Sequence, residues 1–312
     1  MKNLLLATAI SMSIPLCAFA QTVTPMHEVA GVPLVEVSVN GTGPYPFVLD
    51  TGASVTMVKG PLFQALKIAP TRSVIVAGSL GEGHQQQALP GSLAVAGLGA
   101  DDIEIDMLEE GQLGVLEGHA QGILGENFLK HFDVLIDNER HALTLDRTNR
   151  LARSLAGERL PLSIGDSAAE LTHDRLIVRL RATSLVGRSM LFLVDSGANT
   201  AVVYPLKNET LLFTRGFASG SIQSLDSDQI CRLARTPLTI GSQTYRQAVM
   251  AICENRRRDS INSDGLLPTR LFGRLFISHR DKYLIANPKA ASKDKDRNIK
   301  LAEAITENVT SP

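Results

Sequence analysis

Two short segments of the chain carry the side chains best suited to chemistry. Asp50-Thr51-Gly52 and Asp195-Ser196-Gly197 lie 195 − 50 = 145 residues apart, and each follows an apolar run. One such tripeptide is a weak signal, because glycine makes up about 7% of average sequences. Two copies in matching surroundings predict two carboxylates that the fold brings together.

Paired carboxylates have a characteristic chemistry. Two carboxyl groups a few ångströms apart do not both ionise easily, so the pair shares a proton. One carboxylate can accept a proton from a water molecule between them, while the other carboxyl donates a proton to a carbonyl oxygen. Such a pair hydrolyses an amide without a covalent intermediate, and its pKa values belong to the pair. We therefore expect Asp50 and Asp195 to be catalytic.

The residues that follow each Asp are suited to hold a carboxylate in place. Glycine permits a tight turn because it has no Cβ, and a hydroxyl can bond to neighbouring backbone and orient the carboxylate. The residues expected to support the two loops are Thr51, Gly52, Ala53, Ser196, Gly197 and Ala198. The alternative is that each Asp is an ordinary turn residue.

The pattern before each Asp is the same. Residues 34–39 alternate in the manner of a strand, Asn40-Gly41 is a hairpin-turn dipeptide, and residues 45–49 form a second apolar run. Residues 175–194 repeat this order before the second Asp. Each Asp is therefore expected at the end of a hairpin.

The repeat continues beyond each Asp. Gly122-Ile123-Leu124-Gly125 lies 122 − 50 = 72 residues after Asp50, and Gly265-Leu266-Leu267-Pro268 lies 265 − 195 = 70 residues after Asp195. A short helix candidate (126–131 or 269–274) and a β-hairpin follow each element. Two copies at this scale predict an all-β fold with a duplicated β domain and a few short helices, rather than a solenoid.

The two ends of the chain differ from the repeat. Lys2, an apolar run over 4–14 and the A-x-A site Ala18-Phe19-Ala20 predict a signal peptide over residues 1–20. A lipoprotein anchor at Cys17 is the alternative. The run is too short to span a membrane comfortably, so we expect no membrane span, and export to the periplasm or the exterior. The other parts are a first lobe (21–150), a connector (151–174), a second lobe (175–288) and a polar tail (289–312).

The composition argues against several classes of function. The 31 basic and 32 acidic residues nearly balance, which gives no electrostatic reason to expect nucleic acid or an anionic membrane surface. Tryptophan is absent, so no aromatic platform for stacking bases is visible. The histidines are scattered without a close pair, and we expect neither a metal nor a cofactor.

Cys231 and Cys253 are the cysteines that remain beyond the expected signal peptide. An even number of cysteines in an exported chain predicts a disulfide. A loop of 253 − 231 = 22 residues is worth about 3 kcal/mol in the chain-entropy model. Two buried free thiols are the alternative.

The sequence resembles the pepsin/retropepsin aspartic proteases, most closely the bacterial exported retropepsin-like group with two lobes in one chain. The resemblance rests on the runs around Asp50 and Asp195 and on the Gly122 and Gly265 elements, and covers roughly residues 23–288. It implies duplicated acid-protease-like β-barrel lobes with a cleft between the lobes. It also implies catalysis by Asp50 and Asp195, and hydroxyls of Thr51 and Ser196 that buttress the loops.

The resemblance also implies a flap hairpin that closes over the substrate. Its best positional match is the turn at residues 78–83, with Gly78, Ser79, Leu80 and Gly81 as flap candidates. An ordinary surface loop is the alternative. Pro268 stands where the family's Gly-apolar-apolar element ends in glycine, which implies changed packing beneath the second Asp loop.

We therefore predict an aspartic endopeptidase that acts as a monomeric pseudo-dimer on a peptide or protein substrate. The first alternative is an inactive module of the same fold that binds a peptide or an envelope protein. The second is an oligomer in which the Asp loops of different chains meet.

Overall fold

The structure is a computed structural model that describes residues 21–78, 81–164, 175–181, 188–205, 217–224, 227–253 and 263–291. The predicted signal peptide lies outside the described residues, as do Ser79, Leu80, part of the expected connector and most of the expected tail. Within these ranges, no helix is long and apolar enough to cross a membrane.

The first lobe is an eight-stranded sheet with the strand order β2-β3-β4-β9-β5-β8-β7-β6. Because β3 also pairs with β7, the sheet curls back on itself. The strands are β2 (His27–Val29), β3 (Val32–Val39), β4 (Thr42–Leu49), β5 (Thr56–Lys59), β6 (Arg72–Gly78), β7 (Gly81–Val95), β8 (Leu98–Leu108) and β9 (Gly122–Leu124). The helical segments are α1 (Gly60–Ala65), η1 (Gly114–Leu116) and α2 (Glu126–Leu129).

The second lobe belongs to a thirteen-stranded sheet that also contains strands from the first half of the chain. Its lobe strands run in the order β14-β15-β20-β16-β19-β18-β17. They are β14 (Leu176–Arg181), β15 (Ser189–Asp195), β16 (Ala201–Val203), β17 (Phe217–Ser224), β18 (Ser227–Ile240), β19 (Gln243–Cys253) and β20 (Gly265–Pro268). The short 3-10 helix η2 (Thr269–Leu271) follows β20.

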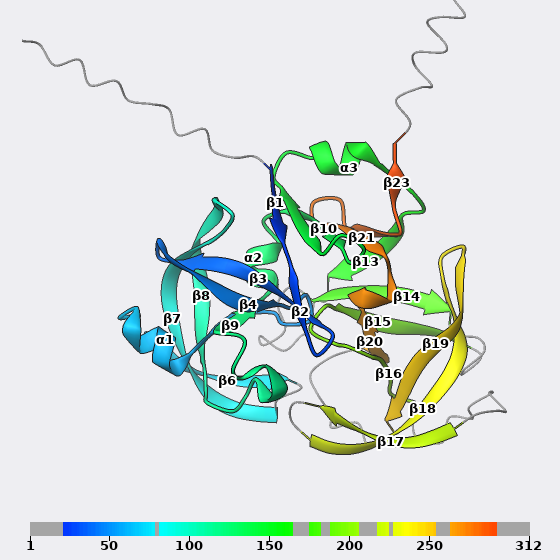
Figure 1. Ribbon diagram of the computed structural model, residues 1–312, viewed down its shortest axis with the longest axis horizontal. Coiled ribbons are helices and arrows are strands. Elements are labelled where there is room, and N and C mark those ends of the chain that lie inside the picture. The colour runs from blue at the N-terminus through cyan, green and yellow to red at the C-terminus, as the bar shows by residue number, and fades with distance from the viewer. Residues whose placement is uncertain are drawn as a thin grey trace, which may run out of the picture.

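A six-stranded section of this sheet joins the two halves, in the order β1-β11-β10-β21-β22-β13, and we call it the central sheet. Its strands are β1 (Gln21–Pro25), β10 (Asp133–Asp137), β11 (Ala142–Asp146), β13 (Leu160–Ile164), β21 (Arg274–Ser278) and β22 (Tyr283–Ala286). Figure 1 shows β10 and β21 between the first lobe on the left and β14–β19 on the right. Beside this sheet lie α3 (Arg150–Ser154) and the strand pair β12 (Leu155–Ala156) and β23 (Lys289–Ala290).

The two halves repeat one topology. In the first lobe β4 pairs in parallel with β9, which pairs in turn with β5; in the second, β15 pairs in parallel with β20, which pairs with β16. A closing hairpin follows each, β10–β11 and β21–β22. The predicted all-β fold is therefore confirmed, with two lobes of matching strand order.

Some of the predicted elements differ from those observed. The second helix candidate, 269–274, is only the short η2, because Arg274 already begins β21 and pairs with Asp137. The expected connector contains β13, which pairs with β22 through Leu160 and Pro161. Proline ends the helical tendency there and leaves these residues to extend the central sheet.

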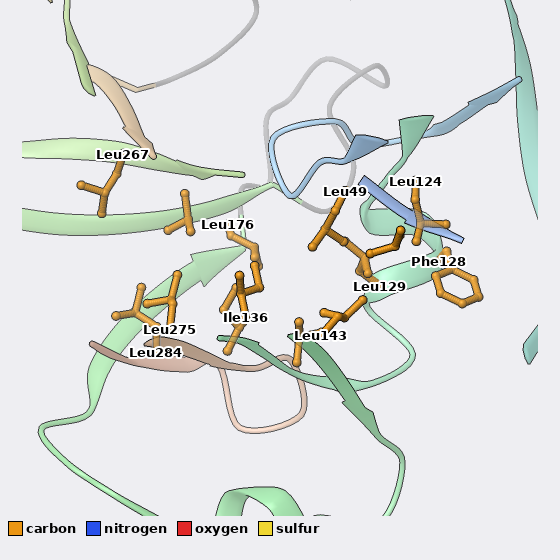
Figure 2. Packing of buried hydrophobic residues seen from close by; sticks show 14 of the residues in the cluster. Leu49, Leu124, Phe128, Leu129, Ile136, Leu143, Leu176, Leu267, Leu275 and Leu284 are labelled. Atoms are coloured by element: carbon orange, nitrogen blue, oxygen red, sulfur yellow. The ribbon is translucent and has the colours of Figure 1, made fainter. Parts of the chain in front are cut away.

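One apolar cluster extends through both lobes and the central sheet. In Figure 2, Leu49 and Leu129 of the first half lie on one side and Leu267 of the second lobe on the other, with Ile136 and Leu176 between them. Each buried apolar side chain of this size contributes about 1.5–3 kcal/mol relative to exposure. The lobes are therefore held together by a shared core as well as by strand pairing.

The shared core gives a stability prediction. Leu275→Ala should lower the free energy of unfolding by about 2–5 kcal/mol, because a cavity would open in the central sheet. Leu275 is fully buried opposite Ile136. Urea unfolding monitored by circular dichroism measures the change, and Val115→Ala is the control at a side chain that is 67% exposed. An effect no larger than the control's would contradict a common core.

Candidate active site

Both Asp loops leave the end of a strand and are supported by a neighbouring parallel strand. Asp50 follows β4, and its N–H donates to the carbonyl of Leu124 in β9 at 3.1 Å. Asp195 is the last residue of β15 and pairs with Pro268 of β20. The same strand arrangement therefore places both carboxyl groups.

Each carboxylate is oriented by N–H groups of its own loop. Asp50 Oδ1 accepts hydrogen bonds from the N–H groups of Gly52 and Ala53 at 2.8 and 3.1 Å. Asp195 Oδ1 accepts one from Ala198 at 2.9 Å. These loops thus hold each Asp as an acceptor of backbone hydrogen bonds.

The two loops approach each other closely at their glycines. A Cβ placed on Gly52 would lie 2.7 Å from Cγ of Asp195, and a Cβ on Gly197 would lie 2.7 Å from Cγ of Asp50. Each glycine therefore lies directly against the carboxyl group of the opposite loop. This contact requires residues without a Cβ, and it brings Asp50 and Asp195 together from the two halves of one chain.

Four reciprocal hydrogen bonds join the loops beneath the carboxyl groups. The Thr51 hydroxyl donates to the carbonyl of Val194 at 2.9 Å and accepts from the Ser196 N–H at 3.0 Å. The Ser196 hydroxyl donates to the carbonyl of Leu49 at 2.6 Å and accepts from the Thr51 N–H at 2.9 Å. Thr51 and Ser196 are buried, so all four bonds cross the lobe interface away from water.

The electrostatics of the two carboxyl groups differ. Burial raises the pKa of Asp50, although the N–H groups of Gly52 and Ala53 and the Asp195 side chain partly offset this. Burial, reinforced by the negative charge of Asp50, holds the pKa of Asp195 well above its ordinary value. Both residues are still partly accessible at the molecular surface. The two carboxyl groups are therefore coupled, and their surroundings favour a proton held by the pair.

Pro268 is accommodated by a second substitution in the same lobe. In the first lobe the Gly125 N–H donates to the Thr56 hydroxyl at 3.1 Å. At the matching places of the second lobe, Pro268 has no N–H and Ala201 has no hydroxyl, so donor and acceptor are absent together. The expected change in packing stays a prediction, and Pro268 keeps its place beside Asp195 in the parallel pair.

The flap candidates lie at the tip of the β6–β7 hairpin, where Gly78 pairs with Gly81. Ser79 and Leu80 between them lie outside the described residues. The matching hairpin of the second lobe is β17–β18, with Ser224 paired to Ser227. Nothing described relates either tip to the Asp loops.

The predicted disulfide between Cys231 and Cys253 is confirmed. It links β18 to β19, where the two cysteines are direct cross-strand partners, both buried. It therefore anchors the β17–β18 hairpin to the body of the second lobe. Among the described residues, no group of three or more His, Cys, Asp or Glu could hold a metal ion.

Two polar residues that support the first loop escaped the sequence analysis. Asn127 Oδ1 accepts hydrogen bonds from the N–H and the hydroxyl of Thr56 at 2.9 and 2.8 Å. Asn127 Nδ2 donates to the carbonyl of Glu104 in β8 at 2.8 Å. Thr56 and Asn127 are 71 residues apart, so no local sequence pattern connects them. The signal available in the sequence was the position of Asn127, two residues beyond Gly125.

The fold and the site define a two-lobed β protein with paired Asp loops. Residues 35–131 match a family model described as "gag-polyprotein putative aspartyl protease". No curated protein matches the chain. A solved retropepsin-like aspartic protease from Rickettsia conorii is 20% identical with a TM-score of 0.30, over 40% of this chain and 89% of that chain. The family match lies within the first half of the chain and includes Asp50.

Ser196 provides a test of the cross-lobe hydrogen bonds. Ser196→Ala leaves the buried Thr51 N–H without its acceptor, which should cost about 1–3 kcal/mol of stability. Ser196→Thr is the matched control, because threonine occupies the equivalent position in the first loop. Thermal unfolding measures both variants, and equal destabilisation by the two would contradict the assignment to the hydroxyl.

Thr56 tests the difference between the lobes. Thr56→Val keeps the size of the side chain but leaves the buried Gly125 N–H unpaired, so stability should fall by about 1–3 kcal/mol. Thr56→Ser retains the hydroxyl and serves as the control. Chemical denaturation distinguishes them; a valine variant as stable as the serine variant would remove the hydroxyl from the argument.

Proposed function

We propose that the protein is an aspartic endopeptidase that hydrolyses peptide bonds through a water molecule activated by Asp50 and Asp195. One observation carries the proposal: Gly52 lies against the carboxyl of Asp195, and Gly197 lies against that of Asp50. This reciprocal contact supports a dyad built within one chain, and hence a monomeric pseudo-dimer as the functional unit.

The hydrogen bonds of the two loops suggest the roles of the two residues, because N–H donors favour an ionised carboxylate and Asp50 has two where Asp195 has one. Asp50, ionised and held by two N–H donors, accepts a proton from the water. The water oxygen attacks the peptide carbonyl carbon while Asp195 gives its proton to the carbonyl oxygen. Asp50 then returns its proton to the leaving nitrogen, the C–N bond breaks, and a hydroxyl proton of the intermediate returns to Asp195. The cycle restores one proton to the pair.

An inactive binding module is the rival function, and Pro268 was its main support. The paired absence of the Pro268 N–H and an Ala201 hydroxyl weakens that argument, because the second loop loses no satisfied hydrogen bond. The disulfide between Cys231 and Cys253 supports location of the protein in an oxidising compartment, in keeping with the proposed export. Peptide or protein is the substrate class that the proposed chemistry requires.

Peptide cleavage by the full mature chain tests the function. Asp50→Asn and Asp195→Asn should each lower kcat/KM by about 10²–10⁴-fold, because each removes one partner in proton transfer. Cleavage of a mixed peptide library, followed by mass spectrometry from acidic to neutral pH, measures the loss. Asp101→Asn changes an exposed carboxylate of β8 and is the control. Full activity of either dyad variant would exclude that residue from the mechanism.

The pH dependence of stability gives a readout that does not need activity. The pKa of Asp195 is raised in the folded protein, so folding takes up a proton and stability falls as the pH rises above the unfolded pKa near 3.8. Asp195→Asn should therefore be more stable than the wild type at neutral pH and inactive. Thermal unfolding at several pH values compares them, and a variant destabilised at neutral pH would contradict the buried, protonated Asp195.

A further inference from the structure

His279 of the second lobe lies across the lobe interface from α2 of the first lobe. It follows the last residue of β21 and is buried. Its Nε2 lies 2.8 Å from Oε2 of Glu126, and its Nδ1 lies 2.7 Å from the carbonyl oxygen of Phe132. Glu126 is completely buried. This is therefore an ion pair and hydrogen bond between lobes, away from the reacting groups.

A short series of contacts connects this pair to the dyad. The Glu126 N–H donates to the carbonyl of Ala53 at 2.8 Å, and the Ala53 N–H donates to Asp50 Oδ1 at 3.1 Å. The next N–H of α2, from Asn127, holds the carbonyl of Ser54 at 3.1 Å. The start of α2 thus lies against the first Asp loop, and Glu126 is the first residue of α2.

The first half of the chain makes the equivalent contact with the second half through Asn138, with different chemistry. Asn138 follows β10 as His279 follows β21. Asn138 Nδ2 donates to the carbonyls of Thr269 and Phe272 beside η2, each at 2.9 Å. The first lobe therefore holds the second through a neutral amide, whereas the second lobe holds the first through a group that titrates.

We propose, on the basis of the proposed function, that His279 is a positioning residue that holds the Asp50 loop through Glu126 and makes that loop sensitive to pH. The reason is geometric. A carbonyl can only accept a hydrogen bond, so Nδ1 must carry a proton toward Phe132, and one further proton must lie between Nε2 and Glu126. Removing a proton leaves two acceptors facing each other in a buried place.

The charged surroundings favour the protonated ring. Burial lowers the pKa of the His279 ring. The charge of Glu126 and the hydrogen bonds to Glu126 and Phe132 outweigh this effect, so the pKa of His279 is raised above its ordinary value. Stability from the pair is therefore fully present below pH 6.5 and is lost as the pH rises through the folded pKa. The charged and titratable groups on the elements around the ring are Glu126, Asp133, Arg147, Arg280, Asp281 and Tyr283.

The pH profile of peptide cleavage tests the proposal. His279→Asn installs the neutral side chain that the other lobe uses, so the part of the alkaline decline due to His279 should disappear. His279→Ala removes the contact and should lower kcat by about 10–100-fold, as a displaced catalytic group does, with KM changed less than about twofold. His141→Asn is the control, because His141 is exposed in the matching turn of the first half.

The carboxyl ¹³C shift of Asp50, assigned with Asp50→Asn, gives a readout independent of turnover. A positioning role predicts that His279→Ala changes the Asp50 titration, whereas a merely structural role would lower stability and leave it unchanged. If His279→Ala does not fold, Glu126→Gln removes the charge and keeps the backbone contact to Ala53, and it should likewise change the Asp50 titration.

The outcomes separate the two proposals. Suppose that the wild type is active, and that its pH profile of kcat and its Asp50 titration are unchanged in His279→Asn, His279→Ala and Glu126→Gln. This result overturns the role of His279 and leaves the proposed protease function intact. An inactive wild type overturns the protease. In that case an Asp50 titration that responds to His279→Ala still supports the coupling, and one that does not respond overturns it.

Discussion

The contact between the two Asp loops is the constraint on which this structure depends. Two carboxyl groups that repel each other are held together by four buried hydrogen bonds of Thr51 and Ser196. A hydrogen bond contributes about 0.5–1.5 kcal/mol net, but an unpaired buried donor costs more. The network is therefore satisfied only when both loops are in place. The central sheet and the common apolar core supply the remaining free energy that keeps the two carboxyl groups close.

One departure of the second lobe from the pseudo-symmetry of the chain is matched by a second departure nearby. Pro268, which lacks a donor, is found with Ala201, which lacks an acceptor, where the first lobe has Gly125 and Thr56. A buried donor without an acceptor would be costly, so the two changes depend on each other. The second lobe thus has a different local solution that keeps the same parallel strand pair beside its Asp.

The lobes also differ in how each holds its partner. Asn138 reaches η2 with an amide that does not titrate, while His279 reaches Glu126 with a ring that does. The dyad is asymmetric as well, because Asp50 accepts hydrogen bonds from two N–H groups of its own loop and Asp195 from one. A duplicated fold is therefore used here with unequal surroundings for its two equivalent carboxyl groups.

Local sequence predicted those parts of the fold that depend on short-range patterns. The alternating strands, the hairpin before each Asp and the cross-strand disulfide all follow from such patterns, and duplication extended them to two lobes. The length of the second helix was overestimated, because residues near Arg274 gain more from pairing with β10 than from continuing a helical turn. β13 was placed in a connector, since its pairing partner in β22 lies more than a hundred residues away.

The sequence by itself determined which residues repeat, and therefore that Asp50 and Asp195 are equivalent. Only the tertiary structure decided that Gly52 and Gly197 lie against the opposite carboxyl groups, that Thr56 and Asn127 support one loop, and that His279 meets Glu126. The physical reason is distance along the chain. These contacts join residues 71 to 153 positions apart, and strand order and lobe packing, which no local propensity encodes, bring them within hydrogen-bonding reach.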